Sequence, residues 1–225
     1  RVRGYGPLLA DPAGLVDLPA GFSYTAFSRT GETMDDGLLV PGLHDGMGAF
    51  PGPEGRTLLV RNHELTWASA GAFGPAGELL EKVDSKRIYD FGDGKTICLG
   101  GTTTLLFDTK TQTLVRQHLS LAGTVRNCGG GVTPWGSWIT CEEAPLRAGQ
   151  LPTLRQDHGY NFEVPAADTG LVTPTPLVAM GRFNHEAIAV HEPSGVVYQT
   201  EDRTDGLLYR FLPATPGKLD TGRLE

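Results

Sequence analysis

The sequence predicts an all-β fold and, within that class, part of a β-propeller. The chain of 225 residues contains 31 Gly and 16 Pro, and these separate short runs of β-forming residues, as is typical of many strands joined by many turns. A unit made of a strand with an acidic end, a loop and an outer strand also occurs three times, as TLLVRNHE with TTTLLFD, GSWITCEE with GYNFEVP, and VVYQTED with GLLYRFLP. Repeated antiparallel units of this size build the blades of propellers.

The repeat gives about twelve strands in three to four blades, whereas propellers close with about 4–8 blades. We therefore expect residues 1–225 to be the N-terminal part of a single propeller domain, six-bladed when complete, whose C-terminal blades are missing from this chain. A β-sandwich is the competing architecture, but it gives no reason for acidic strand ends to recur.

The expected elements of the first half begin with a Pro- and Gly-rich extended lead-in over Arg1–Ala20 and a strand over Phe22–Phe27. Gly31–Gly48 is expected to be loop with short strand pieces. Glu78–Arg87 is the only predicted helix, because its apolar residues are spaced for one face. The other strands expected here are Thr57–Arg61, Thr102–Phe107 and Leu114–Leu121, the last two forming a hairpin.

The second half is predicted to consist of hairpins and single strands. Ala187–His191 and Val196–Thr200 flank a turn that supplies both a Pro and a Gly, so they form a hairpin. Leu177–Met180 leads into this hairpin, and Lys218–Glu225 is a polar tail. The remaining expected strands are Ser137–Thr140, Gly159–Pro165 and Leu207–Leu212.

Charge and composition exclude several classes of partner. The net charge is −7 without a Lys or Arg cluster, which argues against nucleic acid and anionic membrane surfaces. No apolar run approaches the roughly 20 residues of a membrane span. The three cysteines, Cys98, Cys128 and Cys141, cannot all pair within one chain, so a disulfide framework is excluded and the redox compartment stays open.

The hairpin between Ala187 and Thr200 is expected to place two acids face to face at its mouth. If Glu186 lies opposite Glu201, the same register pairs Ile188 with Gln199 and Val190 with Val197. Two adjacent carboxylates repel each other unless a cation lies between them or one keeps its proton. The alternative is that one strand end simply points into water.

The same kind of mouth recurs. Cys128 and Glu143 lie fifteen positions apart, as do Glu186 and Glu201, and the triplet Asn-His-Glu occurs at 62–64 and again at 184–186. In a propeller the inner strands border one channel, so their ends converge. The residues expected to meet there are Asn62, Glu64, Cys128, Glu142 or Glu143, Glu186, and Glu201 or Asp202.

These residue types predict a mixed metal cluster. Oxygen donors in this number suit Ca²⁺, whereas a thiolate suits iron, zinc or copper. For Cys128 a role as a small buried residue beside glycines is an equal alternative. We assign Cys98 and Cys141 to packing. His63 and His185 are expected to be structural, because strand alternation turns them away from the neighbouring glutamates.

Four arginines lie beside these strand ends, Arg61, Arg126, Arg182 and Arg203, and of these Arg126 and Arg203 are the candidates for recognising a phosphate. Arg126 precedes the Cys128 strand, and Arg203 follows the acidic pair at 201 and 202. A guanidinium fits phosphate or carboxylate geometry, so pairing with neighbouring acids is the alternative for each of them.

The motifs CGGGVTPWGSWITCEE, GRFNHEAIAVHEPSGVVYQTEDR and RNHEL closely resemble the PhoX-type alkaline phosphatases, over nearly the whole chain. The resemblance implies a propeller that holds Fe³⁺ and Ca²⁺ and hydrolyses small phosphate monoesters in the periplasm or outside the cell, after export by the twin-arginine route. It implies that Cys128 is the iron thiolate ligand, that Glu143 and Glu186 are bridging carboxylates, and that Asn62, Glu64, Glu201 and Asp202 are calcium-side ligands. The family has a further ligand segment in its C-terminal part, which this chain lacks. We expect a monomer.

Two other functions are consistent with the residues. One is a calcium-dependent propeller hydrolase of different specificity, a lactonase or phytase, which would not need Cys128. The other is a propeller without activity in which calcium only joins the blades.

Overall fold

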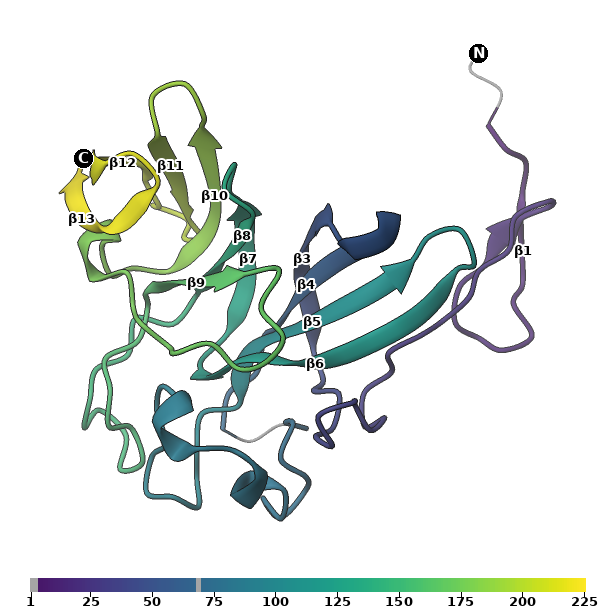
Figure 1. The fold of residues 1–225 in the computed structure, drawn as a ribbon, viewed down its shortest axis with the longest axis horizontal. Helices are drawn as coiled ribbons and strands as arrows, with labels where there is room; N and C mark the ends of the chain where they lie inside the picture. The colour runs from purple at the N-terminus through teal and green to yellow at the C-terminus, as the bar shows by residue number, and fades with distance from the viewer. Residues whose placement is uncertain (1–3, 68–69) are drawn as a thin grey trace.

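The protein is described by a computed structural model that covers residues 4–67 and 70–225. Residues 1–3, where the predicted lead-in begins, lie outside the described residues. Strands dominate the structure (Figure 1). Their bounds are β1 Leu8–Leu9, β2 Leu18–Pro19, β3 His44–Pro51, β4 Thr57–His63, β5 Gly100–Asp108, β6 Thr113–Thr124, β7 Asn127–Val132, β8 Ser137–Glu142, β9 Asn161–Pro165, β10 His185–His191, β11 Val196–Glu201, β12 Leu208–Thr215 and β13 Lys218–Leu224.

Three of the sheets follow one another along the chain, and each is an antiparallel meander. Their strand orders are β3-β4-β5-β6, β7-β8-β9 and β10-β11-β12-β13. In Figure 1 the β7–β9 sheet lies between the other two, and the short β1-β2 pair lies apart from them. The prediction of an all-β fold is confirmed, and the three open sheets are consistent with part of a propeller.

Hydrophobic cores fill the spaces between successive sheets. Phe50, Val60 and Leu121 of the first sheet pack against Trp138 and Phe162 of the second. A second core joins the second and third sheets through Ile139, Cys141, Ile188, Val197 and Phe211. Each sheet therefore buries one face against its neighbour, as stacked blades do, and Cys141 has the packing role expected from its position.

The first strand of the middle sheet, β7, contacts the first strands of its two neighbours, β3 and β10, across the sheet boundaries. The glycine run of β7 makes this possible. A Cβ on Gly129 would lie 2.2 Å from the carbonyl oxygen of Glu186, and one on Gly131 would lie 2.2 Å from that of Ile188. On the other side, a Cβ on Gly46 would lie 2.7 Å from the carbonyl oxygen of Cys128. Three backbones therefore meet where side chains would keep them apart.

The predicted strand over Phe22–Phe27 does not form, because these residues have no ladder partner. Phe22, Tyr24 and Phe27 are largely exposed, and Phe27 stacks on Phe107 of β5. Their high β propensity therefore does not produce a strand, since propensity reflects packing on a pleated surface that this segment lacks.

The predicted helix over Glu78–Arg87 is wrong, because the segment forms two 3₁₀ turns, Leu80–Lys82 and Ser85–Arg87. Val83 is extended between them, and the Asp84 side chain accepts a hydrogen bond from the backbone of Lys86 to begin the second turn. The apolar spacing did identify the buried face, because Leu79, Leu80 and Val83 pack on the core beside β6.

The C-terminal tail is a strand, contrary to prediction. β13 pairs with β12 and completes the third sheet. Its polar residues face outward, whereas Leu219 is buried in the core between the second and third sheets. One buried position is too weak a signal to distinguish an outer strand from a polar tail. Leu177–Met180, which leads toward the next hairpin, contains the 3₁₀ turn Val178–Met180.

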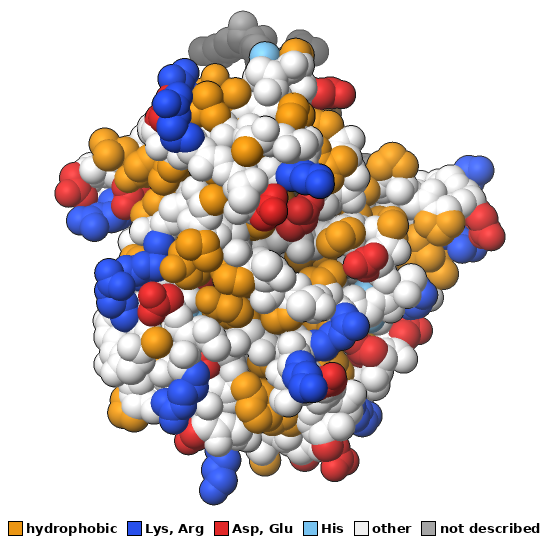
Figure 2. Space-filling view, turned by 60° about the vertical axis from the view of Figure 1, so that its left-hand side comes forward, with side chains coloured by type: hydrophobic (Ala, Val, Ile, Leu, Met, Phe, Trp, Pro, Cys, Tyr) orange, Lys and Arg blue, Asp and Glu red, His pale blue; other side chains and the backbone are white. Residues whose placement is uncertain are grey.

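The surface is mixed in charge. On the face in Figure 2, acidic and basic side chains are interspersed among hydrophobic and uncharged ones. Among the described residues, none of the helices is long and apolar enough to cross a membrane.

His118 on β6 predicts how stability depends on pH. Its ring is buried, and burial, followed by the charge of Arg116, lowers its pKa, whereas Asp35 and Asp36 raise it less. The unfolded chain takes up a proton at this residue as the pH falls through about 6.5, while the folded chain does not. The free energy of unfolding should therefore fall below that pH, by about 1.4 kcal/mol per unit of pKa depression.

Urea unfolding at about pH 7.5 and about pH 5.5 measures this effect. We expect the His118→Gln variant to lose less stability between the two conditions than the parent chain. An equal loss in both proteins would contradict the assignment.

Candidate metal centre

Each of the three inner strands begins with the same irregularity. The register shifts between His44 and Met47 in β3, between Asn127 and Gly130 in β7, and between His185 and Ile188 in β10. In every case two residues of the inner strand lie opposite one residue of the next strand, which is a β-bulge. The bulged pairs are Asp45 with Gly46, Cys128 with Gly129, and Glu186 with Ala187.

A second set of equivalent residues follows the second strand of each sheet. Glu64, Glu143 and Asp202 come directly after the ends of β4, β8 and β11. Their backbone N–H groups donate to the carbonyls of Leu43, Arg126 and Asn184, which each precede an inner strand. The three mouths thus share one backbone design, and each presents one residue from the inner strand and one acid from the second.

Three of these side chains converge directly. One ligand atom each from Cys128, Glu143 and Glu186 lies within 4.8 Å of the other two, with Cys128 buried and both glutamates partly buried. The thiol comes from β7, the first carboxylate from the end of β8 and the second from β10. Adjacent sheets therefore bring a soft ligand and two hard ligands to one point.

The electrostatics of this group favour a cation. Burial raises the pKa of the Cys128 thiol, and the charge of Glu186 raises it further, although the backbone N–H of Gly129 lowers it. Burial also raises the pKa of Glu143; Arg126 lowers it, whereas Asp202, Glu186 and Glu64 raise it. A bound cation would reverse these effects, because metal ligation favours the deprotonated thiol and carboxylate.

Arg126 and Glu64 border the converging group. The Arg126 guanidinium donates to Glu64 Oε1 at 3.0 Å and also pairs with Glu143. Arg126 lies at a positive φ of 50°, which turns the chain into the Cys128 bulge. The sequence placed this arginine at the mouth, and the structure shows it paired with two of the acids there.

Asn62 serves a different purpose, because its side-chain amide is fully used in hydrogen bonds. Nδ2 donates to the carbonyls of Cys128 and Gly129 at 2.8 and 2.6 Å. Oδ1 accepts from Trp138 Nε1 and Thr140 Oγ1 at 2.9 and 2.8 Å. Asn62 is fully buried, so it joins the first sheet to the backbone that carries the thiol.

We expect Asn62→Asp to destabilise the fold. The isosteric carboxylate cannot donate to the two carbonyls and adds a buried charge, so the free energy of unfolding should fall by about 3 kcal/mol or more. Chemical denaturation checks this value. If Asn62 instead contributed its oxygen to calcium, the aspartate would preserve stability and strengthen calcium binding, and that result would overturn the hydrogen-bonding role.

Glu142 and Glu201 are turned away from the converging group. The buried Glu142 carboxylate accepts from the backbone of Val125, Gly159 and Tyr160 and lies 2.7 Å from His158 Nδ1. Glu201 accepts from the backbone of Leu207 and from the Tyr209 hydroxyl. The sequence left open whether Glu142 or Glu143, and whether Glu201 or Asp202, would lie at the site. Glu143 and Asp202 are the two that lie nearer the converging group.

The prediction that Glu186 faces Glu201 is wrong. The register of Ile188 with Gln199 and of Val190 with Val197 is as expected, but the bulge shifts the end of the ladder and pairs His185 with Glu201. The extra residue re-aims Glu186 toward Cys128 and Glu143.

The remaining predicted residues lie at the periphery. Arg203 is exposed and pairs with Asp205 at 3.2 Å. His63 is buried and contacts the carbonyl of Gly42 and the Thr103 hydroxyl. His185 is buried and stacks on Phe183. The two histidines have the structural roles that strand alternation predicted.

Asp45 belongs to the mouths but was missed by sequence reasoning. It occupies the bulge position of β3 that Cys128 and Glu186 occupy in the other sheets. Burial raises its pKa, and the nearby Glu64 carboxylate raises it further, although the backbone N–H of Gly46 lowers it. The signal that could have identified Asp45 is the sequence His-Asp-Gly, which begins the strand before the one that ends at Asn-His-Glu. It was overlooked because the glycines of β3 made this strand look like a loop.

The donor set fits a mixed cluster. One thiol is combined with carboxylates from Asp45, Glu64, Glu143, Glu186 and Asp202. Carboxylates alone would suit Ca²⁺, whereas the thiol adds a ligand for a transition metal.

Comparison with known proteins agrees with this site. The profile of a protein family described as Alkaline phosphatase PhoX matches residues 3–224. No curated protein matches the chain. The family match spans nearly the whole chain and includes all the mouths described above, so the chain belongs to the alkaline phosphatase PhoX family, a family of phosphatase-type hydrolases.

Proposed function

We propose that the protein hydrolyses phosphate monoesters at a cluster of Fe³⁺ and Ca²⁺ held where the three sheets meet. The observation that carries this proposal is the convergence of Cys128, Glu143 and Glu186 within 4.8 Å. The family match supports a metal-dependent phosphatase, and the thiol supports a transition metal beside calcium.

Each residue of the centre has a proposed role. Cys128 would hold iron through its thiolate, and Glu143 and Glu186 would be carboxylate ligands to iron and calcium. Asp45, Glu64 and Asp202 complete the calcium side. When bound, the metal ions supply the charge neutralisation, orientation and nucleophile activation that phosphoryl transfer needs. Asn62, Glu142 and Glu201 support this arrangement through the hydrogen bonds described above.

Arg126 is the proposed phosphate-binding residue nearest the centre. Its guanidinium is partly exposed and already lies against Glu64 and Glu143. Planar N–H donors of this kind bind two phosphate oxygens at once. Arg203 is a second, more distant contact that would act on the outer part of an ester through its exposed position beside Asp202.

We propose that residues 1–225 are the N-terminal part of a larger six-bladed propeller that acts as a monomer on small phosphate esters, in the periplasm or outside the cell. The open sheets and the family match support this arrangement. Further blades would complete the wall of the site opposite β10.

Hydrolysis of p-nitrophenyl phosphate by the full-length protein tests the function, together with elemental analysis. We expect activity that is lost on chelation and restored by iron and calcium together. Calcium without iron, combined with hydrolysis of lactones, would favour the calcium-dependent alternative. Bound calcium without any hydrolysis would show that the ions only join the blades.

Asp45→Asn is expected to weaken calcium binding without removing iron. It takes away one negative charge from the calcium side and keeps the side-chain volume, so the calcium affinity should fall about 10-fold or more. Isothermal titration with Ca²⁺ measures this change. Asp205→Asn, an exposed change on the loop after β11, is the matched control, and equal affinities in the two variants would contradict the role of Asp45.

A further inference from the structure

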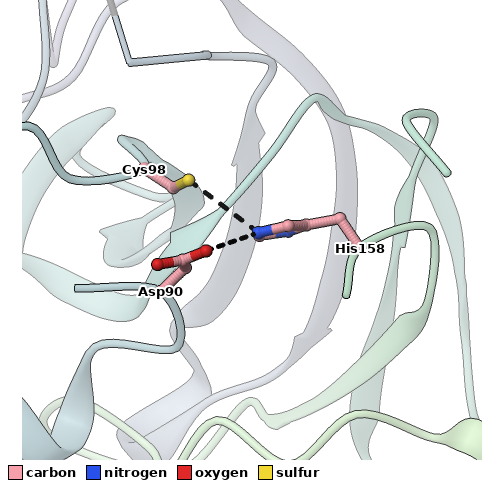
Figure 3. A group of neighbouring side chains, drawn as sticks. All are labelled: Asp90, Cys98 and His158. Atoms are coloured by element: carbon pink, nitrogen blue, oxygen red, sulfur yellow. Dashed lines mark hydrogen bonds and ion pairs between the residues drawn. The ribbon is translucent and has the colours of Figure 1, made fainter. Parts of the chain in front are cut away.

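A second group of ligand-type side chains is buried away from the centre. Asp90, Cys98 and His158 each offer one ligand atom within 4.8 Å of the others, and Asp90 and His158 are fully buried. Figure 3 shows the His158 ring on the side opposite Asp90 and Cys98, with one ring nitrogen facing both of their side chains. No residue is shared with the group at Cys128.

The distances fit a tetrahedral metal ion. His158 Nε2 lies 3.2 Å from Asp90 Oδ2 and 3.8 Å from Cys98 Sγ. A zinc ion with bonds of roughly 2.0–2.3 Å holds neighbouring donor atoms roughly 3.3–3.6 Å apart. The observed separations lie close to this range, so small movements of the side chains would seat an ion between them.

The other ring nitrogen is fixed in the manner typical of a metal-binding histidine. Nδ1 lies 2.7 Å from Glu142 Oε1 and Nε2 lies 3.2 Å from Asp90 Oδ2, so the ring donates to a carboxylate at each nitrogen, and an ion would take the place of the proton on Nε2. Histidine ligands to metals almost always donate their second nitrogen to such an acceptor. Nε2 has only the two longer contacts to oxygen and sulfur, and a single proton cannot serve both well.

The Asp90 side chain is held in place in advance of any ligand. Its Oδ2 accepts from the backbone N–H groups of Arg155 and Gln156 at 2.9 and 3.0 Å, and its Oδ1 accepts from that of Gly92 at 2.8 Å. The two segments that carry the ligands, before β5 and before β9, are long connections with little regular structure. An ion would join them directly.

We propose that Asp90, Cys98 and His158 form a buried site with three protein ligands for Zn²⁺ or a similar divalent transition metal, separate from the centre at Cys128 and independent of the phosphatase function. Its burial leaves no route for a substrate, so its effect is on the stability of the connecting segments. A proton on His158 competes with the ion, so uptake of the ion releases protons.

Metal analysis on a Cys128→Ala background tests the site apart from the centre. We expect this chain, prepared with zinc and dialysed, to keep one zinc ion per molecule. With Co²⁺ in place of zinc, it should show the near-ultraviolet band of a cobalt thiolate. Adding Cys98→Ser should remove both signals, whereas Cys141→Ser, at another buried cysteine, should retain both.

Two results would overturn the proposal. One is a folded Cys128→Ala chain, supplied with zinc or cobalt, that shows no thiolate-bound metal. The other is a metal content unchanged by Cys98→Ser. If Cys98→Ser fails to fold, the measurement on the Cys128→Ala chain alone still decides. If that chain also fails to fold, the parent chain titrated with Co²⁺ decides. A thiolate absorption whose intensity corresponds to one cobalt thiolate per chain, instead of two, would count against the second site.

Discussion

The Cys128→Ala variant is expected to lose iron and at least about 100-fold of the phosphatase activity while keeping its fold. Removal of a group that merely supports a metal ligand costs about 10–100-fold in affinity or activity, so loss of a ligand itself should cost more. The fold should survive, because alanine keeps the Cβ of this small side chain in the core and gives up only weak hydrogen bonds from the thiol to the carbonyls of His185 and Cys141.

Elemental analysis, circular dichroism and p-nitrophenyl phosphate hydrolysis by the full-length protein measure these three expectations. Cys141→Ala is the control, since Cys141 is fully buried one strand away and lies within the core. A Cys128→Ala protein that retains iron and activity would falsify the proposed ligand, and would restore the simpler view of Cys128 as a small packed residue.

Gly129→Ala is expected to destabilise the fold strongly. The added Cβ would lie 2.2 Å from the carbonyl oxygen of Glu186, a backbone atom that cannot rotate away. The strands β7 and β10 would have to separate where the candidate ligands meet. Overpacking typically costs about 1–3 kcal/mol, and a clash with backbone belongs at or above the top of that range.

A loss of about 3 kcal/mol would lower the midpoint of thermal unfolding by about 6–12 °C in a chain of this size. Gly170→Ala is the matched control, because a Cβ there meets nothing within 4 Å and the backbone is not left-handed. The two variants should differ clearly in midpoint. Equal midpoints would show that the inner strands are not packed backbone to backbone in solution.

The sequence was sufficient to predict which strand ends meet. The recurring mouth, with its spacing of fifteen positions, predicted that Cys128, Glu186 and one of Glu142 and Glu143 lie together, and Cys128, Glu143 and Glu186 converge. The hairpin register was also correct at Ile188 and Val190. Periodicity of two along a strand and turn residues between strands carry this information directly.

The bulges could not be predicted, and they account for most of the errors at the site. A bulge leaves the spacing of residues in the sequence unchanged while altering which side chain faces inward. For this reason Glu142 could not be separated from Glu143, and Glu186 was wrongly paired with Glu201. Asp45 was missed because its strand, HDGMGAFP, lacks the alternation of apolar and polar residues.

The sequence positions of Asp90, Cys98 and His158 do not follow the spacing of any recognised metal-binding motif. His158 is separated by 60 and 68 positions from its two partners, and each lies in a connection without regular structure. The predicted packing role of Cys98 is confirmed, because Cys98 is buried beside Val125, Ala144 and Leu154, but nothing in the sequence indicated its two polar neighbours.

The bulge shared by β3, β7 and β10 determines the position of one side chain in each sheet, but it does not determine the type of residue found there. The backbone delivers one side chain per sheet to the same kind of position, yet the three residues are an aspartate, a cysteine and a glutamate. The proposed metal centre would therefore lie in a nearly repeating backbone frame without being symmetric itself, because its one thiol comes from the β7 sheet alone. Changing the residue at position 45, 128 or 186 offers a route to altered metal preference that leaves the scaffold intact.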